Sequence, residues 1–197
     1  MVFFNQKYNH HYDFGCVRNK AYIALVDEYH IEKDGVFYKN GGLVSSPWGT
    51  NQVILSGLDY CIKALSVNPG HMLSLQRHRA RTEDWTVMKG DLTVILDGVL
   101  RIVRKGESLH IPKGAPHCVA NTGGEHVFVR EVQKGICREG DNIRLMDMNG
   151  RPTYPCGSEA EYRAACLYAE LQDRLRTTTG ALSSRGPFQA AGRSHRS

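Results

Sequence analysis

The sequence predicts a single all-β domain, built as an antiparallel sandwich or barrel, with one α-helix after it. Short β-rich runs separated by turns recur about every 8–12 residues between Trp48 and Arg151, as strands do in such folds. The dipeptide Asp97-Gly98 is a strong signal for a tight hairpin between two of these runs. After Pro155 the sequence pattern is that of a helix, with leucines recurring every fourth residue.

Residues 1–44 are predicted to form an N-terminal extension, polar and aromatic, with a hairpin at Asp34-Gly35. Residues 45–151 hold the β-domain. Its nine predicted strands lie near 53–55, 60–67, 72–78, 84–88, 92–96, 99–104, 108–111, 117–120 and 126–133. Their number and spacing favour antiparallel pairing throughout, because short connections cannot join parallel neighbours.

Residues 152–176 are predicted to carry the helix. Ser158 followed by Glu161 is a capping-box signature, since each side chain can accept a backbone N–H of the other residue. One helix face then carries Leu167, Leu171 and Leu175. Residues 177–197 are rich in Thr, Ser, Gly and Arg and are predicted to be a disordered tail.

The composition is that of an ordinary globular domain, with 41% hydrophobic and 23% charged residues and a net charge of +5. No Lys/Arg cluster is interleaved with aromatics, so a nucleic-acid partner is not expected. No apolar stretch approaches the ~20 residues of a membrane helix, and the start of the chain lacks a signal-peptide pattern. The six cysteines are scattered without a CxxC pair, so a cytoplasmic protein with reduced thiols is predicted.

Four side chains of metal-ligand type lie in two stretches punctuated by glycine and proline. Gln76 and His78 are two apart on a predicted strand, so both leave the same face. Glu83 begins the return strand, and His117 opens another strand after the turn at 112–114. These four residues could therefore converge inside one barrel. Two imidazoles, a carboxylate and an amide oxygen suit a divalent cation. Zn is the expected ion, with Mn, Co, Ni or Fe(II) as alternatives.

The two stretches resemble the two motifs of the cupin family, which implies a double-stranded β-helix. Over about residues 47–151 the chain looks like the cupin domain of type II mannose-6-phosphate isomerases, a domain that commonly follows a GDP-mannose pyrophosphorylase domain. The resemblance rests mainly on Pro47-Trp48-Gly49, Asn68-Pro69-Gly70, Ser74-Leu75-Gln76-Arg77-His78, Glu131-Val132-Gln133 and Asp141-Asn142-Ile143-Arg144. The nucleotidyltransferase domain is absent, so pyrophosphorylase activity is not expected.

The resemblance implies a metal-dependent isomerase that interconverts mannose 6-phosphate and fructose 6-phosphate through an enediol. The metal would stabilise the charge that develops on a substrate oxygen. Lys63, Arg81 and Arg144 are implied as catalytic residues and, with Ser74, as the residues that bind the phosphosugar. Glu131 is implied as the catalytic base, with a metal-bound hydroxide as the alternative. A homodimer is expected.

Two alternatives of other classes stay open. Two histidines and a carboxylate with open positions also describe Fe(II) oxygenases. A non-catalytic cupin module that binds a phosphosugar or a nucleotide sugar is the second alternative. It is kept open by Arg79, Ala80 and Asp84, which stand where the resembled family has histidines.

Overall fold

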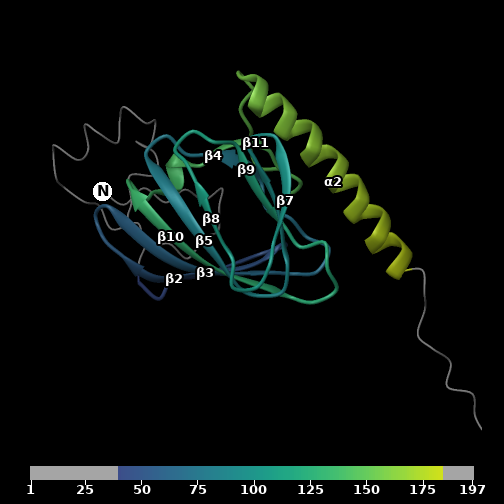
Figure 1. Ribbon diagram of the computed structural model, residues 1–197, viewed down its shortest axis with the longest axis horizontal. Coiled ribbons are helices and arrows are strands. Elements are labelled where there is room, and N and C mark those ends of the chain that lie inside the picture. The colour runs from purple at the N-terminus through teal and green to yellow at the C-terminus, as the bar shows by residue number, and fades with distance from the viewer. Residues whose placement is uncertain (1–39, 184–197) are drawn as a thin grey trace, which may run out of the picture.

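A computed structural model describes residues 40–183, with side chains described for residues 40–177. The hairpin predicted at Asp34-Gly35 lies outside this range. Figure 1 shows strands arranged around a common interior, with the helix α2 (Glu159–Ser183) running along the outside. The strands form two sheets, both antiparallel throughout. This arrangement confirms the predicted all-β cupin barrel with a C-terminal helix.

The larger sheet has the strand order β1-β2-β3-β10-β5-β8, and the smaller has the order β11-β4-β9-β6-β7. The elements have these bounds: β1 Leu43–Ser46, β2 Gly49–Ser56, β3 Tyr60–Val67, β4 Leu75–Arg77, β5 Arg81–Lys89, β6 Leu92–Leu96, β7 Val99–Val103, β8 Ser108–Ile111, β9 His117–Ala120, β10 Val127–Gly135, the 3-10 turn η3 Glu139–Asp141, and β11 Ile143–Met146.

The interior of the barrel is apolar over much of its length. Residues of both sheets meet there, among them Leu65, Val87 and Val129 from the larger sheet and Val94 and Val119 from the smaller. Because side chains alternate along each strand, every second residue of β3, β5 and β10 is buried, except for the last residue of β5 and of β10. Along the inward face of these strands, the side chains are apolar over one part and charged or polar over the other.

Helix α2 packs on the outer face of the smaller sheet. Its residues Tyr168, Leu171 and Leu175 are buried in one cluster with Leu75 of β4 and Cys118 of β9. Within the described residues, no helix is both long and apolar enough to cross a membrane.

The predicted capping box at the start of α2 is confirmed. The Glu161 N–H donates to Ser158 Oγ (3.2 Å), and the Ser158 N–H donates to Glu161 Oε2 (3.1 Å). The helix runs to Ser183, beyond the predicted end at residue 176. Once a helix is nucleated, each further residue adds one backbone hydrogen bond, so a polar sequence can continue it.

The sequence did not predict two short strands, β1 and β11. The sequence Leu43–Ser46 has only two apolar residues, and Ile143–Met146 follows a 3-10 turn, so neither shows a run of alternating residues. Strand β11 matters for function because it pairs with β4 and sets Arg144 directly opposite Gln76. Arg144 therefore lies on a strand of the barrel rather than after the last strand.

Candidate functional site

A charged cluster occupies the inward face of three neighbouring strands of the larger sheet. The register sets Glu131 of β10 opposite Lys63 of β3, and Gln133 of β10 opposite Glu83 of β5. All four side chains are at most 6% exposed. Lys63 shares its buried face with Cys61, as the strand pattern predicts. Such charges are buried only when each has a partner, so their contacts define the site.

The smaller sheet contributes the opposite wall. Gln76 of β4 pairs across the sheet with His117 of β9, and His78 follows directly after β4. His117 and Cys118 point to opposite faces of β9, because successive residues on a strand alternate. Cys118 is buried under α2, while His117 faces the interior.

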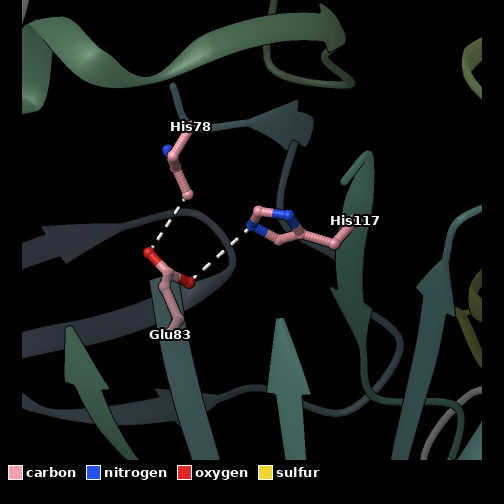
Figure 2. A group of neighbouring side chains, drawn as sticks. All are labelled: His78, Glu83 and His117. Atoms are coloured by element: carbon pink, nitrogen blue, oxygen red, sulfur yellow. Dashed lines mark ion pairs between the residues drawn. The ribbon is translucent and has the colours of Figure 1, made fainter. Parts of the chain in front are cut away.

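The structure brings His78, Glu83 and His117 together, with one potential ligand atom from each lying within 4.8 Å of the others. Figure 2 shows both rings directed at the two oxygens of one carboxylate. His78 Nε2 lies 3.1 Å from Glu83 Oε1, and His117 Nε2 lies 3.7 Å from Glu83 Oε2. All three residues are buried.

Backbone carbonyls fix the tautomer of both rings. His78 Nδ1 donates to the Asp141 carbonyl at 3.0 Å, and His117 Nδ1 donates to the Ala115 carbonyl at 2.9 Å. A carbonyl can only accept, so Nδ1 carries the proton and Nε2 keeps its lone pair. His117 Nε2 is buried and has no hydrogen-bond partner among the described residues. This is how metal-binding histidines are commonly held, so the three residues fit a divalent cation.

The protonation states agree with this use. Burial, reinforced by the neighbouring His78, lowers the pKa of His117 to about 4, so its ring is neutral near pH 7. Burial alone would raise the pKa of Glu83. The neighbouring His78 and Arg81 outweigh burial and hold that pKa well below its usual range. The site thus presents a charged carboxylate and an open imidazole nitrogen.

Gln76, the fourth predicted ligand, lines the pocket next to Glu83. Its Oε1 accepts a hydrogen bond from Ser74 Oγ at 3.0 Å, which orients the amide. Ser74 is 3% exposed and is not among the residues that line the pocket. Ser74 therefore reaches the site through Gln76, and its predicted contact with substrate stays a prediction.

Arg81 lies in the centre of the site with 1% exposure. Its guanidinium donates to Glu83 Oε1 at 3.0 Å, to the Arg138 carbonyl at 2.9 Å and to Asn142 Oδ1 at 2.7 Å. It also lies 3.2 Å from His78 Nε2. Arg81 was predicted as a clamp for the phosphate. In the structure its donors hold the Glu83 carboxylate and the chain that follows β10.

Lys63 and Glu131 form a buried ion pair, with 3.8 Å between Lys63 Nζ and Glu131 Oε1. Burial and the nearby charge of Glu83 raise the pKa of Glu131. A raised pKa suits a group that exchanges protons, but Glu131 as a base stays a prediction. Arg144 lines the same pocket and is paired with Glu139. The cavity within the pocket has a volume of about 60 Å³.

Sequence reasoning missed two residues that shape the site. From the sequence, Gln133 was named only as part of the motif Glu131-Val132-Gln133 and was given no role, yet its Nε2 donates to both Glu83 and Glu131. Trp85 donates from Nε1 to Glu83 Oε2 at 3.2 Å. Glu131 and Gln133 are two apart, which puts both on the inward face of one strand. This spacing is the signal that could have identified Gln133.

Two of the three positions at which the resembled family has histidines lie away from the pocket. Arg79 is exposed, and Asp84 lies on the outer face of β5, where it pairs with His110 and Lys134. The third position, Ala80, is buried directly before Arg81.

The chain matches the family described as mannose-6-phosphate isomerase C-terminal over residues 35–148. A mannose-1-phosphate guanylyltransferase of Escherichia coli K12 is 38% identical over 109 residues, which cover 55% of this chain and 23% of that protein. The alginate biosynthesis protein AlgA of Pseudomonas aeruginosa is 35% identical over 113 residues, 57% of this chain and 24% of that protein. The chain thus spans about a quarter of the length of the curated relatives it matches.

Among solved structures, the capsular polysaccharide assembling protein CapF of Staphylococcus aureus is similar with a TM-score of 0.49. The similarity covers 53% of this chain and 34% of CapF at 16% sequence identity.

These relatives correct the predicted activity. The chain was expected to interconvert mannose 6-phosphate and fructose 6-phosphate. The relatives of E. coli and of Salmonella typhimurium are enzymes named for a different reaction, mannose-1-phosphate guanylyl transfer. The isomerase prediction is therefore wrong. Its physical weakness is that a cupin barrel hosts many reactions, so a match to its motifs indicates the fold more securely than the chemistry.

Proposed function

The chain belongs to the mannose-6-phosphate isomerase C-terminal family, and we propose that it is a metal-holding module that binds the mannosyl phosphate used or formed in guanylyl transfer. The ligand is mannose 1-phosphate or its guanylylated form. The proposal assigns binding to this chain and the transfer step to a catalytic unit of the class for which the relatives are named.

The charge balance of the pocket is the observation that carries the proposal. Lys63, Arg81, Arg144 and Arg151 line it together with three carboxylates. Burial raises the pKa of one of these carboxylates, Glu131, which is paired with Lys63. Four cationic side chains against three carboxylates leave an excess of positive charge on the walls. That excess favours a phosphate, and the polar walls favour a polyhydroxylated sugar.

We propose that His78, Glu83 and His117 hold a divalent cation, with Gln76 as a fourth ligand from the same wall. The absence of thiolates argues against a closed structural zinc site. When bound, the cation would supply a positive centre for an oxygen of the ligand. The chain's own residues set its environment: Arg81, Gln133 and Trp85 hold the carboxylate in place, and the backbone carbonyls hold the rings.

Elemental analysis of the purified protein tests the metal. About one ion per chain is expected, and the double substitution His78→Ala/His117→Ala should abolish it. His110→Ala is the matched control, because His110 pairs with a carboxylate on the exposed outer face. An ion content equal in the three proteins would refute the metal site.

Calorimetric titration tests the ligand. Mannose 1-phosphate and GDP-mannose should bind, while unphosphorylated mannose should bind at least tenfold more weakly, by loss of the charge-assisted contacts. Arg144→Gln should weaken the two phosphorylated ligands. Lys89→Gln, at an exposed ion pair, should leave their affinities unchanged. Equal affinity for mannose and its phosphate would refute the proposal.

A further inference from the structure

Gln133 lies in the wall of the pocket with a buried carbonyl oxygen that no hydrogen bond explains. Its side chain is 1% exposed, and it lines the pocket together with Lys63 and Glu131. Gln133 Oε1 has no hydrogen-bond partner among the described residues. A buried acceptor without a partner is costly, so such an atom in a pocket wall points to a donor supplied by a ligand.

The orientation of the amide is fixed by its surroundings. Gln133 Nε2 donates to Glu83 Oε1 at 2.9 Å and to Glu131 Oε1 at 2.7 Å. Both amide hydrogens are used by these two carboxylates. A flipped amide would place its oxygen against both carboxylate oxygens and lose both bonds. The carbonyl oxygen is therefore held on the side away from the carboxylates.

The unused atom can only accept a hydrogen bond. A phosphate dianion has no hydrogen to donate, whereas each hydroxyl of a sugar has one. We propose that Gln133 Oε1 accepts a hydrogen bond from one hydroxyl of the bound sugar, and that Gln133 thereby determines which mannosyl phosphates bind. This inference rests on the proposed function and adds a residue that selects the sugar part of the ligand.

The same residue links the two halves of the site. Its amide hydrogens connect Glu83, in the proposed metal site, to Glu131, in the pair with Lys63. A sugar hydroxyl on Oε1 would therefore bind to the same amide that connects these two carboxylates. Loss of that hydroxyl should cost affinity because Oε1 is then left buried and unpaired in the complex.

Titration of the wild-type protein with the monodeoxy analogues of mannose 1-phosphate tests the inference. Removal of one hydroxyl should weaken binding by about 10- to 100-fold, and removal of the others should have smaller effects. The variant Gln133→Met keeps the length and burial of the side chain without the amide. In this variant the same deoxy analogue and the parent ligand should bind within about threefold of each other.

Gln52→Met, at an exposed position of β2, is the matched control and should keep the wild-type preference. Equal effects of the missing hydroxyl in wild type and Gln133→Met would overturn the inference and leave the proposed function standing. If no mannosyl phosphate binds the wild type, both fall. Should Gln133→Met fail to fold, a structure of the wild-type complex decides. A hydroxyl oxygen within about 3.2 Å of Gln133 Oε1 supports the inference, and its absence overturns it.

Discussion

Arg81→Met should destabilise the protein strongly, because Arg81 is the cation that offsets a buried carboxylate. Methionine keeps the approximate length of the side chain and its burial, so the change removes the charge and the donors rather than the volume. The substitution deletes the bonds to Glu83 Oε1, the Arg138 carbonyl and Asn142 Oδ1. It leaves Glu83 at 1% exposure without its arginine.

The expected loss follows from the burial of both partners. Removing one member of a buried ion pair costs about 3–5 kcal/mol, since the other charge stays desolvated and unpaired. The total free energy of unfolding of a domain is about 5–15 kcal/mol, so a large share of the stability should disappear. The retained donors of Gln133 and Trp85 to the same carboxylate place the expected value near the lower end, about 3 kcal/mol.

Urea unfolding followed by circular dichroism measures this loss. Arg163→Met is the matched control, because Arg163 forms an exposed pair with Glu159 one turn away on α2. That pair should contribute only about 0.3–0.5 kcal/mol. If Arg81→Met costs less than about 1 kcal/mol, Arg81 does not hold the carboxylate, and its donors are open to a ligand as the sequence predicted.

Three further outcomes are expected. Glu161→Gln should cost about 0.5–2 kcal/mol at pH 7 by weakening the cap of α2. Burial opposes the charge of Glu161, but backbone N–H groups and Arg77 lower its pKa on balance. The cap should therefore contribute its full stability above the pKa that Glu161 has in the unfolded chain, and this stability should be lost as the pH falls through the pKa that Glu161 has in the folded chain. The variant should lack this pH dependence in urea titrations from pH 7 to 3. A thiol reagent should label the exposed Cys166 before the buried Cys61, Cys118 and Cys137. Burial raises the pKa of these three thiols, so little of the reactive thiolate is present. Early labelling of the three would contradict the packing. Gly135→Ala should destabilise the protein by more than about 1 kcal/mol. Gly135 has φ +115°, and a Cβ there would lie 2.3 Å from the Ala80 carbonyl oxygen. A smaller loss in the same unfolding assay would show that the end of β10 can shift.

The local patterns predicted the barrel and the meeting of three of its site residues. Gln76 and His78 lie two apart at the end of β4, and Glu83 follows on β5 after a short turn. These two strands belong to different sheets, so the short connection, and not strand pairing, keeps the three residues close. The position of His117 depends in addition on the pairing of β9 with β4, which joins segments farther apart in the sequence. The proline and glycine of the turn before His117 make the start of β9 recognisable in the sequence. Whether the residues hold a metal, and whether the protein is the expected homodimer, stay predictions.

The sequence could not predict the hydrogen-bond network around the metal-ligand residues. Gln133 contacts Glu83 only because β10 lies between β3 and β5 in a particular register, and no local pattern encodes that order. The short strand β11 was missed for a related reason, since four residues after a 3-10 turn become a strand only when β4 is there to pair with them. The arginine donors could not be assigned to protein or ligand before the turn at 138–142 was placed.

Helix α2 gives the pocket a second level of control. Leu75 and Cys118 are buried on the helix side of the sheet. Their chain neighbours lie on the other side, where Gln76 lines the pocket and His117 lies with His78 and Glu83. The sheet is one residue thick, so a change in how Tyr168 or Leu171 packs is transmitted through the backbone to the side chains on the other side. Substitutions beneath the helix should therefore alter ligand affinity from a distance.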